Sequence, residues 1–203
     1  MVTQVKAVVF DQGGVLSLGG EKGANEKAAA QVMGLPNPIV VPDLIEALKR
    51  GQIGNNEFID EINRRYPNAP NKCTDEMWNL IHSWWLKPDE RSYRLAAQCR
   101  ASGRRVGLLS NINPAMVRLL RADGSYKGFD PLVLSCMVGC AKPDPEIYAV
   151  VEAGLSGIKP GEILLLDDQQ KCIDGARRQG WQAMLVTDLD KMVRDVTSLL
   201  SLG

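Results

Sequence analysis

Residues 8–16, Val8-Val9-Phe10-Asp11-Gln12-Gly13-Gly14-Val15-Leu16, decide how the rest of the chain is organised. Residues 5–10 are mostly apolar and rich in β-branched side chains, a composition that predicts a buried strand. The strand ends in Asp11, and the two glycines after it let the backbone turn and approach a ligand closely. Ligands of open α/β sheets bind at the carboxyl ends of the strands, so Asp11 is a candidate for a reacting group.

Strand patterns recur in the second half of the chain and alternate there with helical patterns. Strands are predicted at residues 105–109, 132–134, 163–166 and 183–186, and helices at residues 92–102, from 114 onward, 146–153 and 173–179. Because strands alternate with helices, the fold class is expected to be α/β, with a doubly wound parallel sheet of the Rossmann-like type.

Residues 17–88 differ from the rest because they carry helical patterns and no strand pattern. The sequence therefore predicts two domains. Residues 1–16 and 89–203 would form the Rossmann-like core, and residues 17–88 would be a helical cap inserted over the ends of its strands.

Three signals mark where the helices of this insertion are expected to begin. Asp43 and Glu46 have the spacing of a capping box, Asn56 is a candidate cap for the next helix, and Thr74 is expected to start another. The adjacent tryptophans at positions 84 and 85 favour core packing over a ligand platform.

Composition and charge exclude several classes of protein. The 203 residues are 45% hydrophobic and 24% charged, and the 24 basic residues balance the 24 acidic ones. This balance gives no indication of nucleic acid or of a membrane surface as a partner. No apolar run is long enough to span a bilayer, and the first residues lead straight into a strand, so we expect a cytoplasmic protein. The sequence leaves the oligomeric state open, although its tryptophans could form an apolar patch for a partner.

The cysteines and the single histidine are expected to be structural. Five cysteines are an odd number for a disulfide framework, and they lack the partners that a four-ligand zinc site needs. His82 has no recognisable partner in the sequence. We therefore expect small core residues at positions 73, 99, 136, 140 and 172.

Polar residues follow several of the predicted strands at the same edge of the sheet. Asp11, Ser110 and the pair Asp167-Asp168 each end a strand, and Lys142 lies in a loop on that side. Carboxylates gathered at one place repel each other unless a cation joins them, and oxygen ligands suit Mg²⁺. A carboxylate, a hydroxyl, a lysine and a divalent ion are the groups needed to hold and attack a phosphoryl group.

On these residues the chain resembles the haloacid dehalogenase-like (HAD) hydrolases. The resemblance extends over the whole chain, because the helical insertion looks like the cap domain of that family. Asp-x-Gly in the first motif and Asp-Asp in the last resemble the subgroup with sugar-phosphate phosphatases and the amino-terminal domain of soluble epoxide hydrolases. The motifs that carry the resemblance are residues 10–16, Ser110-Asn111, residues 142–148 (Lys-Pro-Asp-Pro-Glu-Ile-Tyr), and Leu166-Asp167-Asp168 followed by Gly175-Ala176.

The resemblance implies a role for each matching residue. Asp11 would be the nucleophile and would form an aspartyl-phosphate. Ser110 and the backbone amide of Asn111 would bind phosphoryl oxygens. Lys142 would balance the charge of the nucleophile and of the phosphate.

The resemblance also implies Mg²⁺ as the cofactor. The ion would be held by the carboxylate of Asp11, the backbone carbonyl of Gly13 and Asp168, with Asp167 beside it. The spacing of the motif favours Asp168 over Asp167 as the direct ligand.

One position departs from many phosphatases of this family. These enzymes carry a second aspartate two residues after the nucleophile, which protonates the leaving group and later activates water, whereas this chain has Gly13 there. Loss of a general acid/base typically costs about 10²–10⁴-fold in rate. Some members of the similar subgroup have the same glycine, so inactivity does not follow.

The leading interpretation is a Mg²⁺-dependent phosphatase of a small phosphorylated metabolite, whose identity the sequence does not give. One alternative is a metal-free 2-haloacid dehalogenase, which would use Asp11 to displace halide and would have no use for the Asp167-Asp168 pair. The other is a member of the fold that binds a ligand without turnover, an interpretation that rests on Gly13 alone.

Overall fold

The computed structural model describes residues 4–18, 23–84 and 86–202. Its core is a five-stranded sheet in the order β5-β4-β1-β6-β7, and all neighbouring strands run parallel. The strands are β1 (Ala7–Phe10), β4 (Arg105–Ser110), β5 (Leu132–Leu134), β6 (Ile163–Asp167) and β7 (Gln182–Leu185). The predicted parallel α/β core is confirmed.

Strand β1 lies at the centre of the sheet, paired with β4 on one side and β6 on the other. Its side chains alternate between two apolar clusters, with Val8 and Phe10 in one and Ala7 and Val9 in the other. A strand that is buried on both faces must be apolar throughout, which explains why its sequence shows a continuous apolar run.

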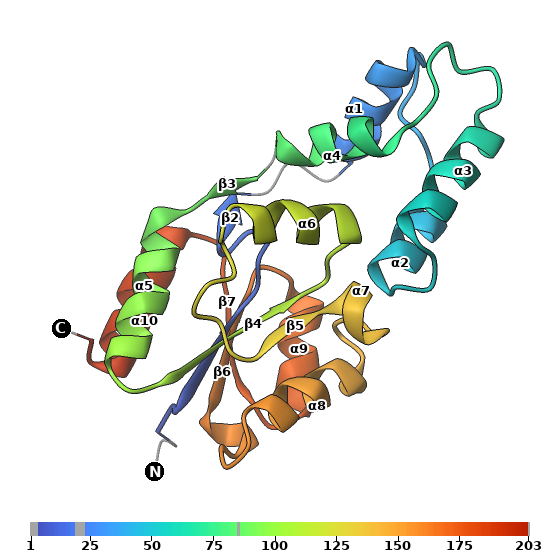
Figure 1. Cartoon of the computed structure of the whole chain (residues 1–203). Helices are drawn as coiled ribbons and strands as arrows, with labels where there is room; N and C mark the ends of the chain where they lie inside the picture. Colours follow the sequence, from blue (N-terminus) through green and yellow to red (C-terminus); the bar gives the residue numbers. More distant parts are fainter. Residues whose placement is uncertain (1–3, 19–22, 85, 203) are drawn as a thin grey trace.

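Helices cover both faces of the sheet, as Figure 1 shows. Helices α5 (Glu90–Ala101), α6 (Pro114–Ala122) and α10 (Leu189–Leu200) contribute to the cluster around Phe10. Helices α8 (Pro145–Gly154) and α9 (Gln170–Arg178) contribute to the cluster around Val9. The short elements α7 (Ser135–Val138) and η1 (Pro160–Glu162) lie in connections. The sheet is therefore doubly wound.

The insertion after β1 is built from α1 (Ala24–Met33), α2 (Pro42–Lys49), α3 (Asn55–Arg65) and α4 (Asp75–Ser83). These helices extend away from the sheet (Figure 1) and bury an apolar cluster around Phe58 and Trp78, to which Ala115 of α6 also contributes. This inserted helical unit is the cap. That it acts as a separate domain bounded at residues 17 and 88 remains a prediction.

The expectation that residues 17–88 contain no strand is wrong at both ends of the range. Strands β2 (Ser17–Leu18) and β3 (Lys87–Pro88) form a separate two-stranded antiparallel sheet where the chain leaves and re-enters the core. The amide of Asp89 continues this contact by donating to the carbonyl of Leu16 over 2.9 Å. The two segments that connect core and cap satisfy the hydrogen-bonding capacity of their backbone N–H and C=O groups by pairing with each other. Strands of two residues are too short to give a periodic pattern in the sequence.

The helix starts in the cap follow the predictions only in part. The hydroxyl of Thr74 accepts a hydrogen bond from a backbone amide one turn later, so this cap is confirmed. Asp43 lies inside α2, which begins with Pro42 at its first position, and Asn56 lies inside α3, whose cap is Gly54. These two predictions are wrong, because proline fixes a first helical position without a side-chain cap and glycine also serves as an N-cap.

Other features outside the site also differ from the sequence-based expectation. Helix α10 was not predicted. Trp84 is 43% exposed, so its assignment to the core is wrong, and Trp85 lies outside the described residues.

All five cysteines are free, with positions 73, 99 and 172 buried and positions 136 and 140 partly buried. Within the described part of the chain, no helix has the length and apolarity needed to cross a membrane.

Candidate active site

Three carboxylates gather at the carboxyl ends of the two central strands. Asp11 follows β1, Asp167 is the last residue of β6, and Asp168 comes next. One carboxylate oxygen from each of the three lies within 4.8 Å of the others. Because β1 and β6 pair in parallel register, their ends meet at one edge of the sheet. The sequence therefore placed these three residues together correctly.

Lys142 holds two of these carboxylates. Its ammonium lies 2.9 Å from Oδ1 of Asp11 and 2.6 Å from Oδ2 of Asp167, and it also donates to the carbonyl of Leu109 over 2.8 Å. The Lys142 side chain is 1% exposed. Burial opposes its charged form, but the two carboxylates raise the pKa of Lys142 above its ordinary value. Lys142 is therefore a buried, fully paired cation.

The carboxylate of Asp11 is held on one side and free on the other. Its Oδ1 accepts hydrogen bonds from the amide of Gln12 over 2.7 Å and from Lys142, whereas its Oδ2 has no partner among the described residues. Burial raises the pKa of Asp11 to about 6, with Lys142 acting in the opposite direction and Asp167 adding to the rise. A fixed carboxylate with one free oxygen has the geometry of a nucleophile.

The two members of the acidic pair have different partners. Asp167 is fully buried; its Oδ1 accepts from the amide of Gln169 over 2.8 Å and its Oδ2 from Lys142. Asp168 is exposed, and its carboxylate makes no side-chain hydrogen bond or ion pair with any described residue. Although the residue as a whole is exposed, its carboxyl group is partly buried, and this burial together with the charge of Asp167 raises the pKa of Asp168. Of the two, Asp168 has the carboxylate that is available to a ligand.

Strand β4 supplies the neighbouring polar groups. Ser110 is buried, and its hydroxyl has no hydrogen-bond partner within the described ranges. The side-chain amide of Asn111 donates to the carbonyl of Lys142 and accepts from its amide, each over 2.8 Å. The Asn111 side chain therefore fixes the Lys142 loop, which the sequence did not predict.

The two glycines after the nucleophile have different roles. At Gly14, φ is +71°, and a Cβ would lie 2.6 Å from Oδ2 of Asp168, so any side chain would displace that carboxylate. At Gly13, φ lies outside the left-handed range, and no atom lies within 4 Å of a Cβ. The hydrogen bonds of this turn use the amide of Gly14 and the carbonyl of Gln12, not the carbonyl of Gly13.

These residues fit a divalent cation. Three ionised carboxylates and one ammonium leave two negative charges in a small volume, and all available donors are oxygens, which suit Mg²⁺. Lys142 pairs with Oδ1 of Asp11 and with Asp167. Among the described residues, Oδ2 of Asp11 and the carboxylate of Asp168 have no such partner and are available to a cation. The space for the Asp168 carboxylate exists because residue 14 is glycine.

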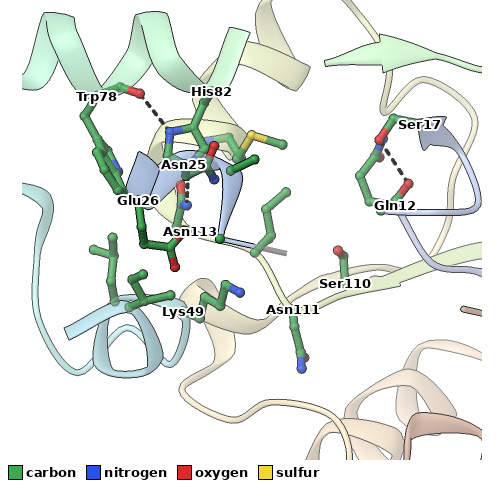
Figure 2. Close-up of a pocket in the computed structure, with 17 residues that line it drawn as sticks. Gln12, Ser17, Asn25, Glu26, Lys49, Trp78, His82, Ser110, Asn111 and Asn113 are labelled. Atoms are coloured by element: carbon green, nitrogen blue, oxygen red, sulfur yellow. Dashed lines mark hydrogen bonds between the residues drawn. The ribbon is translucent and has the colours of Figure 1, made fainter. Parts of the chain in front are cut away.

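A cavity of about 420 Å³ lies between the ends of these strands and the cap. Gln12, Gly13, Ser110 and Asn111 line it from the core. Figure 2 shows the cap side opposite Ser110 and Asn111. The residues that line it from the cap include Asn25, Glu26, Lys49, Trp78 and His82. The volume suits a small molecule.

His82 has partners that the sequence did not reveal. Its Nδ1 lies 2.7 Å from the carbonyl of Trp78, and its Nε2 lies 2.9 Å from the side-chain amide of Asn113 (Figure 2). A carbonyl can only accept, so Nδ1 carries the proton and Nε2 accepts from Asn113. Burial lowers the pKa of His82, which favours this neutral form. His82 thus joins cap helix α4 to the start of core helix α6.

Comparison with known proteins identifies the family to which this site belongs. The model of the haloacid dehalogenase-like hydrolases matches residues 5–180. The chain belongs to this family. Its predicted membership and its predicted enzyme class, a hydrolase, are therefore confirmed.

Relatives of this hydrolase include named phosphatases. "Phosphatase MT3486" of Mycobacterium tuberculosis (strain CDC 1551 / Oshkosh) is 29% identical, with 96% of this chain and 95% of that protein aligned. The similarity to "Bifunctional epoxide hydrolase 2" of Sus scrofa is 40% identity over 68 residues, which are 34% of this chain and 12% of that protein.

A solved structure shows the same fold. A HAD family enzyme from Bacteroides thetaiotaomicron, bt-2542, in complex with magnesium and inorganic phosphate, superimposes with a TM-score of 0.73. The match covers 89% of this chain and 93% of that one at 21% identity.

Proposed function

We propose that this hydrolase is a Mg²⁺-dependent phosphatase that acts on small phosphorylated metabolites through an aspartyl-phosphate at Asp11. The observation that carries the proposal is the cluster of Asp11, Asp167 and Asp168, in which Asp11 and Asp167 pair with the buried ammonium of Lys142. This cluster adjoins a cavity of about 420 Å³ that Gln12 and Gly13 line. The complex of the Bacteroides enzyme with magnesium and phosphate lends support, as does the phosphatase from Mycobacterium tuberculosis.

In the first step, the free carboxylate oxygen of Asp11 forms a bond to phosphorus while the bond from phosphorus to the leaving oxygen breaks. Ser110 and the amide of Asn111 bind phosphoryl oxygens; among the described residues, neither the hydroxyl nor the amide has another partner. Lys142 keeps Asp11 ionised and oriented, because it holds the other oxygen of the same carboxylate.

In the second step, water attacks phosphorus, inorganic phosphate leaves and the Asp11 carboxylate is restored. The side chain of residue 13 takes no part in either step, because it is glycine. The leaving group therefore departs with the help of its own acidity or of solvent. Leaving groups with low pKa values are expected to be favoured for this reason.

Mg²⁺, when bound, would balance the negative charge of the phosphoryl group and of the carboxylates. Asp168 would hold it, together with the carboxylate group of Asp11 and the carbonyl of Gly13. Asp167 would act through Lys142, since both of its oxygens already accept hydrogen bonds.

The same cluster weighs against a metal-free dehalogenase. Such an enzyme needs the nucleophile and a positive site for the halide, and a further free carboxylate next to Asp11 would repel both the nucleophile and the halide. The free carboxylate of Asp168 lies within 4.8 Å of Asp11, and a cation bound between the two carboxylates would offset their repulsion.

The proposal is tested by a phosphatase screen over a panel of phosphorylated metabolites, with Mg²⁺ and with a chelator. We expect release of phosphate from at least one class of ester, and loss of that activity with the chelator. Release of halide from 2-haloacids without metal, and no phosphate release, would favour the dehalogenase instead. Binding of phosphate esters without any turnover would support the non-catalytic alternative.

A further inference from the structure

The end of cap helix α2 contacts the loop that carries Lys142. Arg50 caps this helix, and its guanidinium forms an ion pair with the carboxylate of Asp144 through Nη1, with a second contact of 3.4 Å from Nη2 to Oδ1. The Nε of Arg50 donates to Glu46 over 2.6 Å, which fixes the guanidinium along the helix. The Arg50 and Asp144 side chains are 24% and 31% exposed, so the pair is largely shielded from solvent.

A second ion pair between cap and core is more open. Arg118 of α6 contacts Asp75 of α4 over 2.8 Å, with side chains 47% and 41% exposed. Gly51, the residue after Arg50, lets the cap backbone approach the core backbone closely. Its φ is +63°, and a Cβ at this position would overlap the carbonyl oxygen of Cys136. The end of α2 is thus a second place where the cap lies against the core, besides the contact of α4 with α6.

The loop of Lys142 is held from two sides. The core holds it through the two hydrogen bonds between Asn111 and the backbone of Lys142. The cap holds it through Arg50 and Asp144, and Asp144 closes the turn by donating its amide to the carbonyl of Ala141 over 2.8 Å. A movement of α2 therefore pulls on the turn that contains Lys142.

Lys49, directly before Arg50, lines the cavity. It is half-buried and makes no ion pair or side-chain hydrogen bond with any residue that the structure describes. Figure 2 shows its amine pointing from α2 toward the side of Ser110 and Asn111. Glu26 lines the same cavity, but no ion pair joins it to Lys49. An ammonium that is partly removed from water without a counter-ion favours binding of an anion.

We propose that Arg50 is a positioning residue: its ion pair with Asp144 locks the cap onto the Lys142 loop and places the ammonium of Lys49 in the cavity, where it pairs with an anionic oxygen of the bound phosphate ester. The identity of that anion rests on the proposed function. Lys49 thereby contributes from the cap a positive charge that the core residues of the site lack, since Lys142 is already paired with Asp11 and Asp167.

The alternative is that Arg50 and Asp144 form an ordinary surface ion pair. Such pairs contribute little, and their removal affects neither a distant loop nor a ligand. The two interpretations differ in whether Lys49 and Arg50 act together, which a double-mutant cycle measures.

Binding of inorganic phosphate in the presence of Mg²⁺, measured by calorimetry, tests the proposal without any need for turnover. Lys49→Gln should weaken phosphate binding about tenfold, the effect of losing one charge-assisted hydrogen bond. Arg50→Gln and Asp144→Asn should each weaken it by a similar factor. Lys49→Gln should add little further loss in the Arg50→Gln protein. The matched control is Arg64→Gln, which removes a pair with Glu61 inside α3 and should bind phosphate like the native protein.

Two further measurements separate positioning from loss of structure. The exchanged pair, Arg50→Glu with Asp144→Arg, should recover most of the binding that either single charge reversal loses. Hydrogen exchange at residues 136–148 should be faster in Arg50→Gln and unchanged in Arg64→Gln, with melting temperatures showing that each variant is folded.

Native-like phosphate binding in Lys49→Gln or Arg50→Gln, fully additive losses in the double variant, or no binding by the native protein would each overturn the proposal. The proposed function fails separately. If phosphate binds with the predicted dependence on both residues but no ester is hydrolysed, the positioning role stands and the phosphatase assignment falls.

Discussion

The two sides of the cavity differ in how their polar groups are used. On the core side, Lys142 has three partners, Asp167 uses both oxygens and Asn111 uses both ends of its amide. On the cap side, Lys49 has no partner among the described residues, and two buried polar atoms, Oδ1 of Asn25 and Nε1 of Trp78, are also unpaired. The hydroxyl of Ser110, the carboxylate of Asp168 and the side-chain amide of Gln12 also lack partners among the described residues of the core. The core groups that hold the nucleophile are nevertheless fixed, which suits chemistry that is the same for every substrate. The cap pairs His82 but leaves Lys49, Asn25 and Trp78 open, which suits recognition of a particular substrate.

The largest effect is expected on the core side, at Asp11. Asp11→Asn should reduce turnover by about 10⁴-fold, because an amide is a far poorer nucleophile and a weaker metal ligand. The melting temperature should change little, since the amide has the same shape. The control is Asp195→Asn, a change at a partly exposed residue of α10 that pairs with Lys191 and should retain full activity. Substantial activity of Asp11→Asn in steady-state assays would remove Asp11 from the mechanism.

The acidic pair should separate metal binding from stability. Asp168→Ala should weaken Mg²⁺ binding about 100-fold with little change in stability, because its carboxylate makes no ion pair with any residue in the described ranges. Asp167→Ala should weaken Mg²⁺ binding less but lower the free energy of unfolding by about 3–5 kcal/mol, because it removes one of the two carboxylates that pair with buried Lys142. Calorimetry and thermal unfolding measure the two effects. The reverse order of metal affinities would show that the ligand is Asp167.

A smaller effect is expected at Gly13, where the core lacks a proton donor. The backbone there accepts a side chain without strain, so Gly13→Asp should fold normally. The variant should hydrolyse alkyl phosphates about tenfold faster, with less gain on aryl phosphates, because an acid helps a basic leaving group most. The measurement is the slope of log(kcat/KM) against leaving-group pKa. A slope that is already flat in the native protein, with chemistry rate-limiting, would mean that another residue donates the proton.

The smallest effect concerns pH and the metal. Burial raises the pKa of Asp11 from 3.8 to about 6, so the folded protein without metal loses stability as pH rises through this interval. Mg²⁺ binds the ionised carboxylate and must displace a proton at low pH. The increase in melting temperature on adding Mg²⁺ should therefore be larger at about pH 7.5 than at about pH 5, by a few degrees. An equal increase at both pH values would contradict the raised pKa.

Much of the core side could be predicted from the sequence, for a physical reason. Strands β1, β4 and β6 are buried on both faces, so each is a short apolar run that ends at a polar residue. Parallel pairing then brings these ends to one edge, which is why Asp11, Ser110 and the Asp167-Asp168 pair could be grouped without a structure.

The contacts of the cap could not be predicted in the same way. Arg50 and Asp144 are 94 residues apart, and His82 and Asn113 are 31 apart, on elements whose relative position no local pattern fixes. Lys49 ends an ordinary amphipathic helix, and nothing in its surroundings in the sequence distinguishes it from an exposed lysine. Strands β2 and β3 could not be predicted because each has only two residues.

The central claim is that Asp11 carries the phosphoryl group during the reaction. It is tested most directly by acid quenching of the Mg²⁺-loaded protein during turnover of an aryl phosphate, followed by digestion and mass spectrometry of the peptide that contains Asp11. The account predicts one added phosphoryl group on Asp11 in the native protein and none in Asp11→Asn. Turnover of the same substrate with the phosphoryl group on another residue, or with no phosphorylated peptide at any quench time, would contradict it.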